Sequence, residues 1–227
     1  MWIKVCANTS LEDALLAAGL GADAVGFVFA QSSRRLTPAQ AAAITPHLPD
    51  AVERIGVFDT QDASEIVATV AHARLTGVQL HGSLDLRLVR YLHQALGKGI
   101  TLIQTLHWNI TPGAPSSAEA VSEQLRSIRQ QTSIERIMVD SRVGGASGGT
   151  GIPFNWNDAA EVLSAELGDL HLIVAGGLRP ENVQHAIHSL SPWGVDVATG
   201  VEASPGKKDP EKLKAFLRKA SLSSLPG

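Results

Sequence analysis

The chain has 227 residues, of which 44% are hydrophobic and 18% charged, so it can build a substantial core and is not disordered by composition. A formal net charge of -3 and scattered basic residues give no reason to expect nucleic acid or an acidic membrane surface as a partner. The N-terminus has no apolar signal core, no long apolar stretch is present, and the single cysteine, Cys6, fits a reducing compartment. We therefore expect a soluble, cytoplasmic protein.

Short β-branched apolar runs alternate with longer amphipathic segments from one end of the chain to the other. Their near-continuous apolar character is typical of strands in a parallel sheet that is buried on both faces. In chain order, the expected strands are Trp2–Cys6, Ala24–Phe29, Arg54–Phe58, Gly77–Leu80, Thr101–Thr105, Arg136–Asp140, His171–Ala175 and Gly194–Ala198.

The segments between these strands have helical periodicity, and several begin with residues that favour a helix N-terminus. Thr37-Pro38 places a capping hydroxyl before a first-turn proline, and Ser10 precedes two acidic residues that suit the positive end of the helix dipole. Arg179–Asn182 has a similar proline-then-acid character. The expected helices begin near Ser10, Thr37, Asp62, Ser83, Ser116, Asn155, Arg179 and Asp209.

Eight strand–helix repeats with short connections favour the α/β class and a single (β/α)8 TIM barrel. A doubly wound open sheet is the alternative, but it usually needs fewer strands. Trp108–Ser117 is the longest irregular stretch and is expected to be a loop, and no Pro/Gly/Ser-rich linker divides the chain. We expect one catalytic barrel domain over residues 1–220 and a frayed tail over residues 221–227.

Cys6 and Asp140 are the candidates for proton transfer. In a barrel of this kind the active site lies at the C-terminal ends of the strands, and these residues end the first and sixth expected strands. A thiolate can act as a base, and a carboxyl whose pKa is raised by burial can donate a proton. For Cys6 the structural alternative is a small buried filler, whereas Asp140 follows an apolar run and must be solvated, paired or used.

Glycine-rich segments follow each of the last three expected strands. Gly176-Gly177 and Gly200-Val201 each stand where an apolar strand leads into a helix, and backbone N–H groups at such turns can bind a phosphate. A tight turn without a ligand explains either pair alone equally well, but two pairs in consecutive final repeats favour phosphate. The third segment, Gly144–Gly151, contains Gly149 and is expected to be a flap over the substrate rather than a plain surface loop.

Three further polar residues are candidates for substrate contact. Arg35 can bind a carboxylate through two parallel hydrogen bonds, whereas we expect its neighbour Arg34 to be solvated surface. Gln79 and His81 lie at the end of the fourth strand, although a satisfied core histidine explains His81 at least as well. The remaining histidines are dispersed, so no metal site is expected.

Several short segments of the chain match the sequence pattern of a known family. Each segment alone is weak evidence, but their occurrence together and in the same order is highly specific. The segments are Lys4–Cys6, Leu11–Ala14, Gly21–Phe29, Ser33–Arg35, Gly56–Phe58, Val78–Gly82, Gly148–Gly151, Gly176–Val183 and Gly200–Asp209. Through them the chain resembles the phosphoribosylanthranilate isomerase family of tryptophan biosynthesis along essentially its whole length.

The resemblance implies an Amadori rearrangement of N-(5-phosphoribosyl)anthranilate to 1-(2-carboxyphenylamino)-1-deoxyribulose 5-phosphate, without a metal or organic cofactor. It implies that Asp140 is the general acid that opens the ribose ring and that Cys6 is the general base that removes a proton from the neighbouring sugar carbon. Arg35 would hold the anthranilate carboxylate, and the loops after the last two strands would bind the phosphate. The expected partner is this small phosphorylated substrate, and the chain is expected to be a monomer or a homodimer.

The chain departs from the family pattern at a few positions beside the expected site. Ala7-Asn8 replaces the usual Gly-Ile after the cysteine, Ile152 stands where a lysine is frequent, Asn155 replaces a common aspartate, and Ala198-Thr199 replaces a serine pair. None of these changes removes a proton-transfer group.

Two other functions are compatible with the residues alone. One is a different phosphate-binding barrel enzyme, such as a sugar-phosphate epimerase or lyase, and the other is a non-catalytic barrel that binds a phosphorylated ligand. Arg35 argues against the first, because a substrate without an aromatic carboxylate has no use for it.

Overall fold

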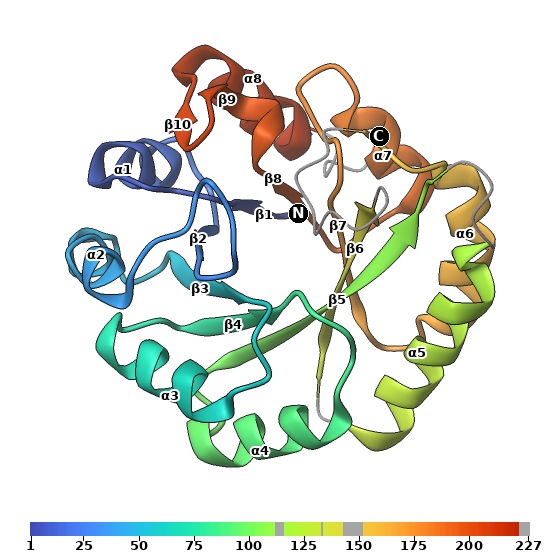
Figure 1. Cartoon of the computed structure of the whole chain (residues 1–227). Helices are drawn as coiled ribbons and strands as arrows, with labels where there is room; N and C mark the ends of the chain where they lie inside the picture. Colours follow the sequence, from blue (N-terminus) through green and yellow to red (C-terminus); the bar gives the residue numbers. More distant parts are fainter. Residues whose placement is uncertain (112–115, 133, 143–151, 223–227) are drawn as a thin grey trace.

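Eight parallel strands pair in chain order, and the last returns to the first to close a barrel (Figure 1). The structure is a computed structural model that describes residues 1–111, 116–132, 134–142 and 152–222. The barrel expected from the sequence is confirmed, and the alternative of an open sheet is wrong. The strands are β1 (Trp2–Val5), β2 (Ala24–Val28), β3 (Glu53–Phe58), β4 (Gly77–Leu80), β5 (Thr101–Asn109), β6 (Arg136–Arg142), β7 (His171–Val174) and β8 (Gly194–Val197).

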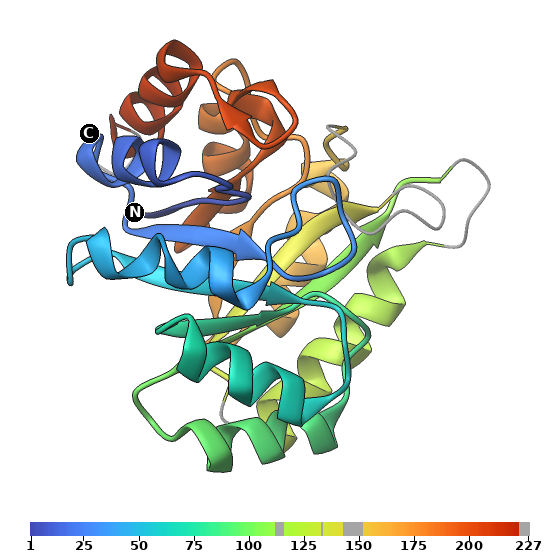
Figure 2. The same cartoon turned by 60° about the vertical axis from the view of Figure 1, so that its left-hand side comes forward.

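Helices surround the barrel, and each strand is followed by one of them (Figures 1 and 2). They are α1 (Leu11–Gly19), α2 (Pro38–Ala42), α3 (Ala63–His72), α4 (Leu86–Leu96), α5 (Ser117–Gln131), α6 (Trp156–Glu166), α7 (Val183–Leu190) and α8 (Pro210–Leu222). A 3₁₀ turn, η1 (Thr45–His47), follows α2. Between β8 and α8 the chain adds a second such turn, η2 (Thr199–Val201), and a short antiparallel hairpin of β9 (Glu202–Ser204) and β10 (Lys207–Lys208).

Apolar side chains fill two separate regions. The larger cluster packs the strands against the surrounding helices. The smaller cluster fills the barrel interior, as layers of inward-pointing side chains do in this fold. It comes from β1, β2, β3, β5, β6 and β7 and from the residue after β7, and consists of Trp2, Ala24, Ile55, Ile103, Met138, Ile173 and Ala175. The interior is therefore a packed core, which leaves the C-terminal ends of the strands for chemistry.

Strand β5 is longer than expected, and the prediction of a loop over Trp108–Ser117 is wrong at both ends. The pairing of β5 with β6 continues to Asn109 opposite Arg142. Trp108 is buried and stacks on Phe154, with 5.8 Å between ring centroids, so its apolar surface favours the strand. Ser117 is the first residue of α5. Residues 112–115 lie outside the described residues.

Most helices begin where the capping residues predict. Ser10 accepts a hydrogen bond from the N–H of Asp13, and Thr37 forms a reciprocal capping box with Gln40. These caps supply acceptors for N–H groups that have no partner within the helix.

Two helix starts differ from the prediction, and each has a local cause. Helix α4 begins after Asp85 rather than near Ser83, because the Asp85 carboxylate caps its first turn. Helix α7 begins after Asn182 rather than near Arg179. The Asn182 amide accepts the N–H of Arg179 and donates to the carbonyl of Gly177, which holds this proline-containing segment in a turn.

The described helices include none long and apolar enough to cross a bilayer. Of the expected C-terminal tail, Ser221 and Leu222 belong to α8, and residues 223–227 lie outside the described residues.

Candidate functional site

A cavity at the C-terminal ends of the strands brings together four of the expected site residues. Cys6 follows β1, Gln79 lies in β4, His81 follows β4, and Asp140 lies in β6, and all four line this one cavity. The closed barrel is the reason, because it places the carboxyl ends of β1, β4 and β6 around the same mouth.

The thiol of Cys6 is buried beside a positive charge. Its backbone N–H continues the β1–β8 ladder by donating to the carbonyl of Val197 at 2.8 Å. Burial raises the pKa of the Cys6 thiol, and the positive charge of Lys4 opposes that rise. A thiolate formed here would therefore be paired with a buried cation.

Lys4 and Asp196 form a buried ion pair that sequence analysis missed. The Nζ of Lys4 donates to Oδ1 of Asp196 at 2.9 Å, and the lysine side chain is 0% exposed. The two residues are register partners on β1 and β8, and Asp196 lines the cavity. The sequence does contain an indication of this pair, since each of the two charged residues interrupts an otherwise apolar strand and a buried charge requires a partner.

Asp140 has the ionisation behaviour of a general acid. Burial, together with the negative charge of Asp196, raises the pKa of Asp140 to about 7, while the N–H of Ser141 and the charge of Lys4 oppose the rise. A substantial fraction of the carboxyl is therefore protonated at neutral pH. A Cβ at Gly176 would lie 2.8 Å from the Asp140 carboxylate, so glycine is what lets the loop after β7 pass this close.

The two arginines differ in exposure, and Arg34 is not the solvated surface residue that the sequence predicts. Arg34 lines the cavity and its side chain is only 17% exposed, because its guanidinium forms an ion pair with Glu202. Arg35 is exposed and is not among the cavity-lining residues. Arg35 bridges to Val28, whereas Arg34 lies in the turn before it, which the N–H of Arg35 closes by donating to the carbonyl of Ser32 at 3.2 Å.

The glycines after β7 and β8 occupy positions where a residue with a side chain would have a strained backbone or would clash with its neighbours. Gly176 and Gly177 have φ angles of +82° and +65°, and a Cβ at Gly200 would overlap the carbonyl oxygen of Leu178. The side chain of Val201 is buried, and its N–H lies 3.4 Å from the carbonyl oxygen of Ala198. Gly200 and Val201 directly follow Ala198-Thr199 of the cavity wall, and Gly176 lies against Asp140, but none of the four candidates for phosphate binding lines the cavity itself. Gly149 lies outside the described residues.

Gln79 is anchored on the barrel wall. Its Nε2 donates to Oγ1 of Thr105 at 3.1 Å and lies 3.2 Å from the sulfur of Met138. His81 packs edge-on against His107, with 4.8 Å between the ring centroids. Within the described ranges, no group of three or more His, Cys, Asp or Glu side chains is arranged to hold a metal ion.

The departures at Ala7 and Asn8 have a clear local structure. Ala7 is buried with φ of +60°, a conformation that costs a non-glycine residue about 1–2 kcal/mol. The Asn8 amide donates to the carbonyls of Val5, at 2.7 Å, and Gly26, at 3.2 Å, and so fastens β1 to β2 beside the thiol.

Comparisons with known proteins point to one family. The family model described as N-(5'phosphoribosyl)anthranilate (PRA) isomerase matches residues 3–219. The chain is 36% identical over 217 residues to the N-(5'-phosphoribosyl)anthranilate isomerase of Pelobacter propionicus, which covers 95% of this chain and 93% of the relative.

Solved structures agree with the family match. A phosphoribosyl anthranilate isomerase in complex with reduced 1-(o-carboxyphenylamino)-1-deoxyribulose 5-phosphate has a TM-score of 0.80 and 33% identity, covering 97% of this chain and 98% of that one. Monomers generated from the dimeric enzyme of Thermotoga maritima have a TM-score of 0.78 and 31% identity, with the same coverage.

Proposed function

Because the chain belongs to the N-(5'-phosphoribosyl)anthranilate isomerase family, we propose that Cys6 and Asp140 are the general base and general acid of its reaction. The chain is an isomerase of tryptophan biosynthesis, and its reaction is the Amadori rearrangement that yields 1-(2-carboxyphenylamino)-1-deoxyribulose 5-phosphate. The observation that carries the assignment of residues is that the thiol and the carboxyl line the same cavity.

In the first half of the reaction the neutral carboxyl of Asp140 protonates the ring oxygen of the ribose. The bond between this oxygen and the anomeric carbon breaks, the oxygen becomes a hydroxyl, and the anthranilate nitrogen lone pair forms a C=N bond. A carboxyl with a pKa of about 7 suits this step, because it is both available and sufficiently acidic at neutral pH.

In the second half the thiolate of Cys6 removes the proton from the adjacent sugar carbon. The electron pair left behind forms a C=C bond and neutralises the iminium nitrogen, which gives an enolamine. This intermediate tautomerises to the ketone as its enol oxygen loses a proton and the former anomeric carbon gains one. The charge of Lys4 stabilises the thiolate, which compensates in part for its burial.

The remaining expected residues bind the two anionic groups of the substrate. We assign the anthranilate carboxylate to Arg34 rather than Arg35, since Arg34 is the arginine at the cavity. Backbone N–H groups of the loops at Gly176-Gly177 and Gly200-Val201 bind the phosphate. A relative of known structure binds a ligand with both groups, which supports a substrate of this class.

Other assigned roles follow from position. Gln79 and His81 contact the sugar from the β4 side of the cavity. Residues 1–220 act as one catalytic domain in the cytoplasm. The dimeric state of the Thermotoga maritima relative supports a homodimer over a monomer.

An assay on freshly generated N-(5'-phosphoribosyl)anthranilate tests the proton-transfer roles. Cys6→Ala and Asp140→Asn should each lower kcat by about 100- to 10,000-fold, the usual contribution of general acid–base catalysis. Asp169→Asn, at an exposed site, is the matched control, and circular dichroism checks that every variant folds. Full activity in both site variants would refute the assignment.

The two arginines give a second, independent test. Arg34→Ala should raise KM by at least about tenfold, because a charge-assisted hydrogen bond to the carboxylate is lost. Arg35→Ala should leave KM within about twofold of the unmodified enzyme, as is usual for an exposed substitution. A large rise in KM for Arg35→Ala, with little change for Arg34→Ala, would instead assign the carboxylate contact to Arg35.

A further inference from the structure

We propose that Glu202 is a positioning residue that fixes Arg34 to receive the substrate carboxylate, and that Lys208 ties this arrangement to the backbone of Cys6. The inference rests on the proposed role of Arg34 in binding the carboxylate. It assigns a function to the β9–β10 hairpin, from which Glu202 and Lys208 both come.

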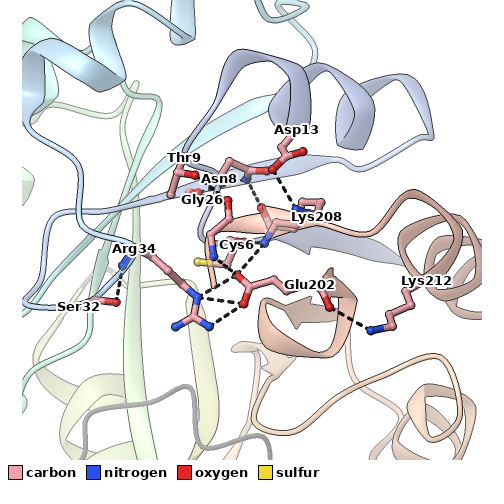
Figure 3. Close-up of polar contacts among 12 residues, drawn as sticks. Cys6, Asn8, Thr9, Asp13, Gly26, Ser32, Arg34, Glu202, Lys208 and Lys212 are labelled. Carbon is pink, nitrogen blue, oxygen red and sulfur yellow. Dashed lines mark hydrogen bonds and ion pairs between the residues drawn. The ribbon is translucent and has the colours of Figure 1, made fainter. Parts of the chain in front are cut away.

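Glu202 engages one edge of the Arg34 guanidinium and leaves another available (Figure 3). Its two carboxylate oxygens accept hydrogen bonds from Nε at 2.8 Å and from Nη2 at 2.6 Å. A guanidinium has five N–H donors, so the edge formed by Nη1 and the second hydrogen of Nη2 remains able to bind another carboxylate through two parallel bonds. Arg34 lines the cavity, where that second carboxylate is supplied by the substrate.

Glu202 is itself held firmly. Its side chain is 5% exposed, and Oε1 also accepts the N–H of Gly206 at 3.2 Å, while its backbone carbonyl accepts Nζ of Lys212 at 3.0 Å. Although burial opposes it, hydrogen bonds from Arg34 and the charge of Lys208 lower the pKa of Glu202. An ionised, immobile carboxylate removes freedom from the long Arg34 side chain before the substrate arrives, and such preorganisation improves affinity.

Lys208 extends the arrangement to the proposed base. Its fully buried Nζ donates to the carbonyl oxygen of Cys6 at 2.6 Å and lies 3.6 Å from Oε1 of Glu202. Its backbone N–H donates to the Asp13 carboxylate at 2.9 Å. In Figure 3 these contacts run without a break from Arg34 through Glu202 and Lys208 to Cys6, so carboxylate recognition and the base share one rigid support.

Binding measurements with two probes separate positioning from general damage. The first is reduced 1-(o-carboxyphenylamino)-1-deoxyribulose 5-phosphate, and the second is ribose 5-phosphate, which has the phosphate but no aromatic carboxylate. Glu202→Gln and Glu202→Asp should each raise the Kd of the first probe about tenfold and change that of the second less than about twofold. Equal weakening of both probes would overturn the proposal, since it is the result of a disturbed hairpin.

Glu202→Asp tests the positioning role without removing the buried negative charge that Glu202→Gln removes. It preserves the negative charge beside buried Lys208 but is one methylene too short to hold Arg34. It therefore decides the matter if Glu202→Gln, which leaves Lys208 uncompensated, does not fold. Glu53→Gln is the control, because Glu53 pairs with Arg136 at 2.7 Å but lies at the start of β3, away from the cavity. It should leave both Kd values unchanged.

A double-variant cycle distinguishes this inference from the proposed function. If Glu202 acts through Arg34, then combining Arg34→Ala with Glu202→Asp should raise the Kd of the first probe no further than Arg34→Ala alone. If Arg34→Ala has no effect, the carboxylate role of Arg34 is wrong. If Arg34→Ala weakens binding but the Glu202 variants do not, or if the effects add, only the positioning role is wrong.

Discussion

Cys6 and Asp140 both hold their protons more tightly than they would in water, and this has consequences for rate. Burial raises the pKa of Asp140 to about 7 and raises the pKa of the Cys6 thiol above its ordinary value. The reactive form needs the carboxyl protonated and the thiol ionised, yet the carboxyl loses its proton first. The reactive form is therefore a minority at every pH, and its population is set by the product of two opposing titrations.

That product predicts an unusual pH profile. Below pH 7 the thiolate fraction grows with pH while the carboxyl stays protonated, so kcat/KM should rise until about pH 7. Between the two pKa values the two changes cancel and the profile should be level, and above the pKa of Cys6 it should fall. Steady-state assays from pH 5 to 10 check this, and a maximum well below pH 7 would contradict it.

Ala7 gives a prediction about stability. Its φ of +60° is strained for alanine, whereas glycine adopts it freely. Ala7→Gly should raise the free energy of unfolding by about 0.5–1 kcal/mol, because relief of the strain exceeds the extra flexibility of the unfolded chain. Urea unfolding measures the change, with Ala39→Gly in exposed helix as the control that should lose stability. A loss at Ala7 as well would show that the strain is small.

The candidate site was predictable where one local rule sufficed. Cys6 and Asp140 each stand at the end of an apolar strand, and that position alone directs them to the barrel mouth. Lys4 and Asp196 were missed because their pairing depends on the register of strands 192 residues apart. The place of Arg34 at the cavity was not predictable, because its partner Glu202 lies 168 residues further along the chain.

Among the elements, strands were easier to predict than the connections between them. Each strand was identifiable from its apolar run, and only β5 was seriously misjudged, since Trp108 continues to pack beyond the expected end at Thr105. The start of α7 was misplaced because the local hydrogen bond from the Asn182 amide to the carbonyl of Gly177, five residues earlier, holds in a turn a segment whose proline favours a helix start.

The loop after β8 packs directly against the loop after β7 at Gly200. A Cβ on Gly200 would overlap the carbonyl oxygen of Leu178, so Gly200→Ala must displace the loops after both β7 and β8. We expect a loss of stability of about 1–3 kcal/mol and weaker binding of inorganic phosphate. Thermal unfolding and competitive inhibition measure the two effects. Gly99→Ala, where a Cβ would contact nothing, is the control, and similar behaviour of the two variants would argue against this packing.

For the whole molecule, the ion pair between Lys4 and Asp196 lies on the seam where the barrel closes. The two residues are opposite each other on β1 and β8. Although burial opposes it, the charge of Asp196 raises the pKa of Lys4, so Lys4 stays protonated at neutral pH. Closure of the barrel therefore buries one charge from its first strand and one from its last.

Breaking this pair should destabilise the entire barrel. Lys4→Met leaves a buried carboxylate without its partner, which costs about 3–5 kcal/mol. Adding Asp196→Leu should recover much of that loss, because no charge then remains unpaired at the seam. Urea unfolding of the single and double variants measures both effects, and a double variant less stable than Lys4→Met would contradict the explanation.

The hairpin after β8 also determines when, during synthesis, the reaction centre comes into being. Lys208 contacts the carbonyl of Cys6 across 202 residues of sequence, and Thr9 bonds to the carbonyl of Gly206. At typical ribosomal speeds of about 5–20 residues per second, Lys208 is translated roughly 10–40 s after Cys6. A nascent chain that stops short of the hairpin would carry its thiol and carboxyl but not the scaffold that aligns them, so catalytic competence requires that the hairpin has been made.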